Sequence, residues 1–290
     1  MDIEATLPPA TVDARAADDV DPVHRLPVRL MHWINVVCLT VLLMSGLNIF
    51  NAHPALYWGQ ESTFAQPWIS FGARNTPQGP VGYTRIAGHE FDTSGVLGLS
   101  TSPDSGTPMA RAFPWWATIP GPQWLAMARH WHFFFAWIFV INGILYVLYT
   151  IFSKHLKRDL VPTRDELKNI GRSIVDHLKF KHPTGEAATR YNVLQSLTYL
   201  IVIFGLLPLV VIAGLAMSPR LDAVFTGWVE LLGGRQSART LHFLTAFGLL
   251  LFVVVHVAEV FIAGVWNEMR SMITGWYALP EDAAKKEAQP

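Results

Sequence analysis

Four histidines lie within apolar stretches of the chain, where an imidazole is costly and therefore informative. Two of them, His242 and His256, are fourteen residues apart in the run SARTLHFLTAFGLLLFVVVHVAEV. On an α-helix, fourteen residues return to within about 40° of the starting direction and rise about 21 Å. These two side chains therefore share one face of a helix at two depths. His32 and His132 lie in two other apolar stretches, and ionisable residues in such places are functional by default.

Two histidines at each of two depths favour b-type haem as the cofactor. Pairs of imidazoles from facing helices of a four-helix bundle fill both axial positions of a haem iron, which suits electron transfer. A zinc site would need three or four ligands at one point. We therefore expect two haem b groups. The alternative from another class is a transporter or structural anchor without haem, in which the histidines pass protons or metal ions.

The composition predicts an integral membrane protein built from helices. Of the 290 residues, 51% are hydrophobic and 15% are charged, whereas soluble domains are about a quarter charged. About 20 apolar residues span the roughly 30 Å of hydrocarbon in a bilayer. Four stretches reach this length, at residues 30–50, 131–152, 197–217 and 241–265. The expected fold is an all-α four-helix bundle surrounded by lipid, and the net charge of zero gives no sign of a nucleic-acid partner.

The distribution of Lys and Arg predicts the orientation of these helices. Nine of the 22 Lys and Arg residues fall between 153 and 190, so the positive-inside rule makes this loop cytoplasmic. Both termini are then cytoplasmic, as tails at 1–29 and 266–290 that flank a haem-binding membrane domain at 30–265. No small-residue cleavage site follows the first span, which is therefore expected to be a retained helix. The expected location is the inner membrane of a bacterium.

This orientation matches the histidines in pairs. The first span begins at the cytoplasmic edge, which places His32 at the level of His256. The second span begins on the outer side, which places His132 at the level of His242. His130 competes with His132, but residues two apart differ by about 200° around a helix, so both cannot face the bundle. We choose His132 because it lies deeper in the span.

The other histidines, cysteine and glycines add smaller constraints. The single cysteine, Cys38, excludes a disulfide framework or a cysteine metal cluster within one chain, and no C-x-x-C-H motif for covalently attached haem is present. Gly46 and Gly143 are expected to face the outer site, where a flat macrocycle needs helices without side chains. The remaining histidines fall in loops and are expected to be solvated: His24, His53, His89, His155, His177 and His182.

Two long loops carry their own signals. Residues 51–127, on the outer side, contain nine Gly and nine Pro with five interspersed Trp, and so long a stretch without helical periodicity is typical of a functional loop or docking surface. The cytoplasmic loop 153–190 contains RDELKNIGRSIVDHL. Its spacing predicts an amphipathic helix at the membrane surface.

Three segments together resemble a known family. They are RLMHWINVVCLTVLLMSGLNIFNAHPALYWG, RHWHFFFAWIFVINGILY and GGRQSARTLHFLTAFGLLLFVVVHV. The chain is similar over most of residues 24–265 to the bacterial cytochrome b subunits of the cytochrome b561, nickel-hydrogenase and formate-dehydrogenase gamma type. Within this group it looks most like the branch of thiosulfate-reductase cytochrome b subunits. The long outer loop fits only in its first part.

The resemblance implies a four-helix subunit with two b haems that passes electrons between a peripheral redox enzyme and the quinone pool. It carries the ligand role onto His32, His132, His242 and His256, although His130 stands where the family more often has arginine. Arginines at the ends of the spans suit haem propionates, because guanidinium forms paired hydrogen bonds with carboxylates. Arg29 suits the inner haem, and the candidates for the outer haem are Arg129, Arg235 and Arg239.

These features give one leading hypothesis for function and one close alternative. In the first, a periplasmic redox subunit exchanges electrons with the outer haem, and quinone reacts near the inner haem. The branch points to a molybdenum-cofactor oxidoreductase, of sulfite-oxidase type, as that partner. In the alternative, the protein acts alone as a haem b quinone oxidoreductase with a small diffusible donor such as superoxide. No catalytic residue beyond the electron-transfer sites is expected in either case.

Overall fold

The computed structural model describes residues 24–121, 123–153, 156, 161–168, 170–178, 193–225 and 227–276. Four segments are long and apolar enough to cross a membrane: α1 (Leu26–Phe50), α2 (Leu125–Phe152), a composite helix (Val193–Ala216) and α9 (Arg235–Thr274). The composite helix consists of α5 (Val193–Ile201), a π-helical turn η5 (Val202–Leu206) and α6 (Leu207–Ala216). Four long apolar helices are thus confirmed.

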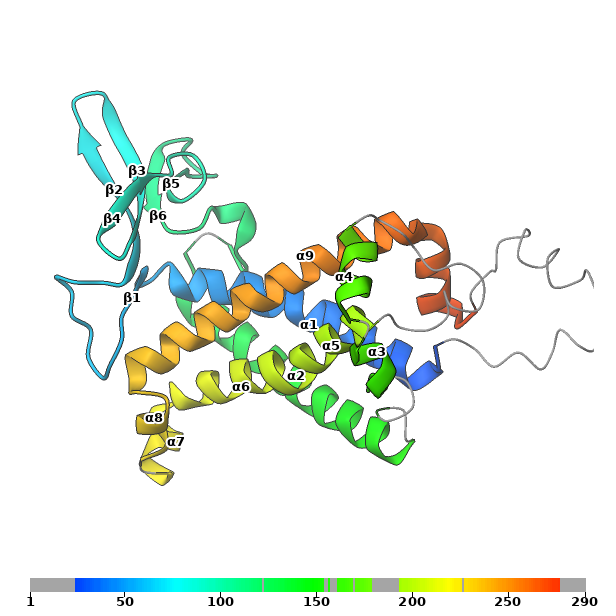
Figure 1. Ribbon diagram of the computed structural model, residues 1–290. Coiled ribbons are helices and arrows are strands. Elements are labelled where there is room, and N and C mark those ends of the chain that lie inside the picture. Colours follow the sequence, from blue (N-terminus) through cyan, green and yellow to red (C-terminus); the bar gives the residue numbers. More distant parts are fainter. Residues whose placement is uncertain are drawn as a thin grey trace, which may run out of the picture.

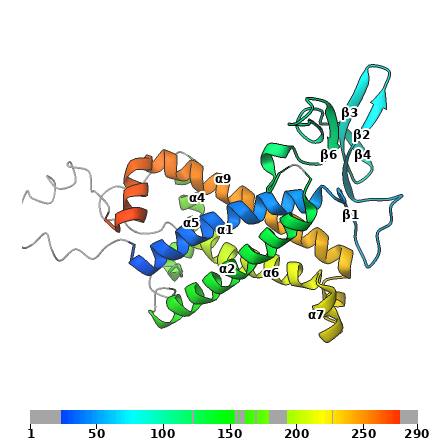
Figure 2. The same ribbon diagram turned by 180° about the vertical axis from the view of Figure 1, so that it is seen from behind.

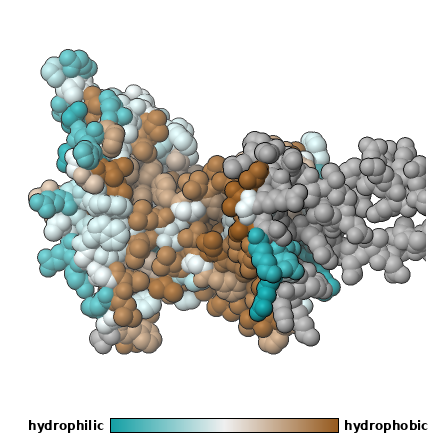
Figure 3. Space-filling view, in the orientation of Figure 1, coloured by the Kyte–Doolittle hydropathy of each residue, from teal (hydrophilic) through white to brown (hydrophobic). Residues whose placement is uncertain are grey.

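The helices extend beyond the predicted apolar runs because their ends continue into polar segments. The start of α1 carries a proline in its first turn, where the missing N–H costs nothing. Large apolar side chains point away from the bundle, and Trp137 and Leu251 are 63% and 65% exposed. Figure 3 shows hydrophobic side chains gathered over the helices. This surface suits contact with lipid.

The helices pack as two hairpins. Neighbouring helices run in opposite directions (Figures 1 and 2), with α1 packed against α2 and α6 against α9. The end of the bundle where α1 stops and α2 begins carries all six strands and is called the β end here (Figure 1). The opposite end holds both ends of the described chain and is called the terminal end (Figure 1). Both hairpins therefore reach from one end to the other.

Residues 51–121 and 123–124, called the β region here, contain all the described strands, so the all-α prediction is wrong for this segment. A four-stranded antiparallel sheet has the order β1 (Ala55–Leu56), β2 (Ile69–Thr76), β3 (Gly79–Ile86), β4 (His89–Asp92). A second sheet pairs β5 (Gly98–Thr101) with β6 (Pro108–Arg111), and a short helix η2 (Trp115–Ala117) follows. Some glycines and prolines of this segment form turns, as at Pro77 and Gly88, and others lie within strands, as Gly72 and Gly98 do.

The hairpin turns explain why a search for helical periodicity misses these strands. In the β3–β4 hairpin, Ile86 pairs with His89, and the two turn residues Ala87 and Gly88 have φ of 47° and 84°. Two left-handed residues between paired strands form the turn that suits the twist of a β-hairpin. Pro77 and Gln78 similarly separate β2 from β3, where Thr76 pairs with Gly79. The sequence signal of a strand is a two-residue period, which a search for the 3.6-residue helical period does not detect.

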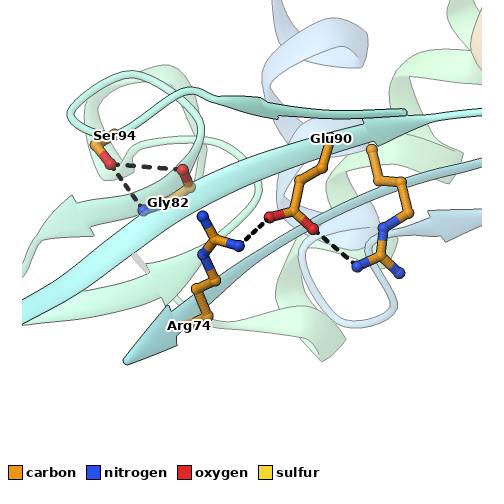
Figure 4. Close-up of polar contacts among 5 residues, drawn as sticks. Arg74, Gly82, Glu90 and Ser94 are labelled. Carbon is orange, nitrogen blue, oxygen red and sulfur yellow. Dashed lines mark hydrogen bonds and ion pairs between the residues drawn. The ribbon is translucent and has the colours of Figure 1, made fainter. Parts of the chain in front are cut away.

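The β region is fixed to the bundle by an aromatic core and carries ion pairs on its surface. Phe50, Phe71 and Phe113 are buried together, and Phe243 and Phe247 of α9 pack against them. On the outer surface, Glu90 accepts hydrogen bonds from Arg74 and Arg85, and the Ser94 hydroxyl contacts Gly82 (Figure 4). Such exposed ion pairs contribute little stability. The aromatic core is therefore the main attachment.

The first turns of α9 add polar attachments to the same segment. Arg239 donates to the carbonyls of His53 and Ala55, and Thr240 donates to the carbonyl of Tyr57 at 2.7 Å. The beginning of α9 therefore holds the chain that leads from α1 into the β region.

The short helices flank the bundle. The predicted amphipathic segment is helical in its described part, as α3 (Arg164–Lys168) and α4 (Ile170–Leu178). At the β end, α7 (Pro219–Val224) and α8 (Trp228–Leu231) connect α6 to α9. Near its end α9 bends at Gly264, whose φ is 114°. The bend redirects the last residues of α9, 265–274.

Close packing of the two sheets makes Gly98 irreplaceable in this fold. A Cβ at Gly98 would lie 2.3 Å from the carbonyl oxygen of Gly72. We expect Gly98→Ala to lower the free energy of unfolding by at least about 2 kcal/mol and to expose the β region to protease. Gly95→Ala is the matched control, because Gly95 has a φ of 83° with nothing within 4 Å of its Cβ position. Equal protease sensitivity of the two variants would contradict this packing.

Candidate functional site

The four predicted histidines form two pairs across the two hairpins. At the β end, the ring centroids of His132 from α2 and His242 from α9 are 6.1 Å apart, with planes inclined by 67°. At the terminal end, those of His32 from α1 and His256 from α9 are 6.3 Å apart, with planes inclined by 63°. These are the pairs that the orientation argument predicted. Helix α9 contributes one member to each.

The spacing of each pair fits two imidazoles on opposite sides of one metal ion. A metal–nitrogen bond to imidazole is about 2 Å, so two such rings have centroids about 6 Å apart. Among the described residues, no group of three or more His, Cys, Asp or Glu side chains could hold a metal ion. Each pair therefore offers two ligands, which is what a haem iron takes from a protein that fills both axial positions.

Hydrogen bonds orient the imidazoles at the β end. The Nδ1 of His242 lies 2.8 Å from the carbonyl oxygen of Val210 and must donate to it. The Nδ1 of His132 lies 3.1 Å from the hydroxyl oxygen of Ser45, whose own hydrogen is directed at the carbonyl of Val41, 2.6 Å away. Both Nδ1 atoms then carry hydrogen, which leaves both Nε2 lone pairs for a metal. Such partners are typical of metal-binding histidines.

The pair at the terminal end is held by aromatic rings instead. Phe252 stacks on His256 at 5.8 Å, and Trp33 lies edge-on to His32 at 5.4 Å. The Nδ1 of His32 is buried without a hydrogen-bond partner among the described residues. An unsatisfied buried polar atom costs about 1–3 kcal/mol. This unsatisfied ring nitrogen shows that the site is incomplete with the described residues alone.

Two glycines let the imidazoles of the β end pack closely against neighbouring helices. A Cβ at Gly46 would lie 3.3 Å from His132 Cε1, and a Cβ at Gly214 would lie 3.1 Å from His242 Cε1 and Nδ1. The sequence predicted Gly46 at this site but not Gly214. The predicted Gly143 has nothing within 4 Å of its Cβ position, so it contacts neither histidine of the pair. Both imidazoles of the β end therefore lie directly against helix backbone that carries no side chain.

His130 lies outside the pair. Its side chain is exposed, whereas His132, two residues later, faces His242. The choice of His132 made from its depth therefore agrees with the placement of the two side chains.

The arginines predicted for propionates make other contacts in the described structure. Arg29 donates to the carbonyls of Ile273 and Thr274 at the end of α9, and Arg239 donates to His53 and Ala55. Arg235 donates to the carbonyl of Met217 at 3.1 Å. The guanidinium of Arg129 lies 5.7 Å above the ring of Phe133. Their roles toward propionates stay predictions.

His53 differs from the solvated histidine that the sequence suggested. It is half-buried, stacks on Tyr57 at 5.7 Å, and its Nε2 is buried without a hydrogen-bond partner among the described residues. Burial and the nearby Arg239 guanidinium lower the pKa of His53. The side chain is therefore neutral at pH 7 and belongs to the packing between α9 and the β region.

Residues 23–275 match the family model described as prokaryotic cytochrome b561. The chain belongs to the prokaryotic cytochrome b561 family. It is 27% identical over 257 residues to a protein of Azospira oryzae named "Putative protein-methionine-sulfoxide reductase subunit YedZ1". The aligned region covers 89% of this chain and 98% of that protein. No solved structure is significantly similar to the chain.

Membership of the cytochrome b561 family makes this chain a membrane haem b protein. The four long apolar helices agree with that class. The haem b expected from the histidines is thus confirmed as the kind of cofactor. The number of haem groups and their ligands are taken up as proposals below.

The close contact between Gly214 and His242 allows a test of the cofactor position. We expect Gly214→Val to displace the His242 ring and to lower haem affinity by about tenfold or more, the scale of effects around metal-bound histidines. Gly205→Val is the matched control in the same composite helix, since nothing lies within 4 Å of the Gly205 Cβ position. The haem-to-protein absorbance ratio of the two purified variants measures the difference. Full haem content in Gly214→Val would rule out a haem at this position.

Proposed function

We propose that this chain is a two-haem b electron-transfer subunit. In this proposal, His132 with His242 and His32 with His256 are the axial ligand pairs. The observation that carries it is the presence of two imidazole pairs, 6.1 Å and 6.3 Å between centroids, at two depths of one bundle. Bound haem b would supply a one-electron iron couple at each pair.

The chain itself fixes where the two sites lie. Because His242 and His256 are separated by fourteen residues of one helix, they lie about 21 Å apart along it. The bend at Gly264 comes after both of them, so the spacing is set by unbroken helix. Between the two depths, the buried amide of Asn142 on α2 donates to Asn35 on α1 at 2.8 Å and so fastens the first hairpin.

The proposed orientation places the β end in the periplasm and the terminal end in the cytoplasm. The charged loop 153–190, with nine Lys and Arg, supports it. Quinone would then exchange electrons at the terminal end, near His32 and His256. Both chain termini would be cytoplasmic, in the inner membrane of a bacterium.

The β region is the proposed docking surface for a periplasmic redox subunit. Its exposed aromatic side chains support this role, since aromatic residues are enriched in protein interfaces. They include Phe64 at 76%, Trp116 at 66%, Trp124 at 57% and Phe91 at 53% exposure. The similar Azospira oryzae protein is named a reductase subunit, which favours a subunit role here over a protein that acts alone. A molybdenum-cofactor oxidoreductase remains the proposed class of partner.

A redox titration with absorption spectra tests the ligand pairs. We expect two b-type components in the wild type. His132→Ala and His242→Ala should each remove the same component, while His32→Ala and His256→Ala should each remove the other. His130→Ala is the control and should retain both, because its side chain is exposed outside the pair. Retention of both components in all four ligand variants would refute the proposal.

Co-purification tests the docking surface separately from the haems. We expect the double variant Trp115→Ala and Trp116→Ala to keep its haem but to recover at least about tenfold less of the periplasmic subunit, the loss that follows from removing interface aromatics. Phe152→Ala is the control, because Phe152 is 81% exposed at the terminal end. Undiminished recovery with the double variant, or equal loss with Phe152→Ala, would count against docking at the β region.

A further inference from the structure

Arg111, at the end of β6, is a buried cation without a counter-charge. The residue is only 4% exposed. Its Nη2 donates to the Thr118 hydroxyl at 3.4 Å, and its Nε and Nη1 are buried without hydrogen-bond partners among the described residues. No carboxylate of the described chain forms an ion pair with it. A guanidinium stays charged in proteins, and leaving a charge buried and unpaired is strongly destabilising.

The sheet register places a second unsatisfied polar group on the same face of the β5–β6 ribbon as Arg111. Arg111 pairs with Gly98, and Met109 pairs with Ser100. Cross-strand partners and residues two apart on a strand share one face of a sheet. Arg111 and Ser100 therefore lie on the same face, as a diagonal pair within reach of a long side chain. The hydroxyl of Ser100 is also buried and has no hydrogen-bond partner within the described part of the chain.

Gly98 explains how this face accommodates the guanidinium. It is the residue opposite Arg111 and has no side chain, and a Cβ there would meet the backbone of β2 and β3. The face of the β5–β6 ribbon that bears Arg111 is therefore pressed against the four-stranded sheet. Burial lowers the pKa of Arg111, but not enough to make a guanidinium neutral at pH 7.

We propose that Arg111 and Ser100 form an internal binding site for a carboxylate. Both side chains offer N–H or O–H donors, and a carboxylate accepts several hydrogen bonds. One guanidinium balances one negative charge, so a carboxylate fits better than a phosphate dianion. Because Arg111 is 4% exposed, an acidic side chain of a docked protein cannot reach it without opening the β region.

One source of the carboxylate is a propionate of a haem bound at the β end. This source rests on the proposed function. Thr118 links Arg111 to the bundle, because Thr118 and Asn48 both donate to the carbonyl of Gly121. Asn48 lies one turn beyond Ser45, which contacts His132. The arginines that the sequence suggested for propionates at this end make the contacts described above, whereas Arg111 retains free donors.

The other source is a small carboxylate from solution. A cavity of about 260 Å³ is lined by Ser100, Thr101, Pro108 and Trp115 among others. A solute in this cavity lies beside Ser100, whose hydroxyl is itself buried, so neighbouring side chains must move before the solute reaches that hydroxyl. The two sources share one chemistry and differ in whether the ligand belongs to the cofactor.

The experiment uses the full haem-loaded chain with Arg111→Met and Arg111→Lys. Methionine removes the buried charge with an apolar side chain, a replacement that is often neutral or stabilising for the fold. Arg74→Gln is the control for loss of an exposed arginine in the same region. One arm is a redox titration followed by haem absorption. The other is the thermal unfolding midpoint in sodium acetate compared with sodium chloride at equal ionic strength.

Each source gives its own result. If the ligand is a propionate, Arg111→Met lowers the midpoint potential of the component that His132→Ala removes, because a nearby cation favours the reduced state. Arg111→Lys should lie between this variant and the wild type. If the ligand is a free carboxylate, acetate raises the unfolding midpoint of the wild type but not of Arg111→Met.

The proposal is overturned if Arg111→Met leaves both potentials unchanged and acetate does not stabilise the wild type more than chloride does. It is also overturned if Arg74→Gln reproduces the effects of Arg111→Met. If His132→Ala keeps both haem components, the two-haem proposal is refuted instead. In that case the acetate arm still decides whether Arg111 binds a carboxylate.

Discussion

Four imidazoles inside an apolar bundle are the constraint on which the rest of this structure depends. Each is a polar group removed from water, and the bilayer offers no partner for it. In the fold, these imidazoles are paired across the two hairpins, and His242 and His256 lie on a single helix. Because α9 serves both pairs, its straightness between these residues fixes their separation. The bend at Gly264 is placed beyond the second histidine, where it cannot change that separation.

The same helix connects the β region to the histidine pair at the β end. Its first turns hold the backbone of residues 53–57 through Arg239 and Thr240. One residue after His242, Phe243 joins the aromatic core of the β region. The β region is thus part of the scaffold that positions His242. A partner bound to the β region would lie next to the His132–His242 pair, with only this scaffold between them.

Much of this arrangement follows from the sequence, and the exceptions have physical reasons. The pairing of His32 with His256 needed only the topology and the 3.6-residue period. The strands of 51–127 were missed because their signal is a two-residue period with left-handed turns, as at Ala87 and Gly88. Gly214 could not be predicted, since its neighbour His242 comes from a distant segment, and the burial of Arg111 depends on the missed pairing of β5 with β6. Only the packing of α6 on α9 brings Gly214 to His242.

The two histidine pairs are chemically unequal, although both come from one helix. At the β end, Ser45 and Val210 contact the two Nδ1 atoms, so both imidazoles are fixed in tautomer and made more basic. At the terminal end, aromatic rings hold the imidazoles, and no described residue forms a hydrogen bond with the Nδ1 of His32. This difference between the pairs follows their positions at the two ends of the bundle. The β-end pair is enclosed beneath a folded β region, whereas the other lies where Arg29 and Trp33 fasten the last turn of α9 to the start of α1. A bundle that carried charge between two different reactants would need two unequal sites, and the surroundings of these imidazoles already make them so.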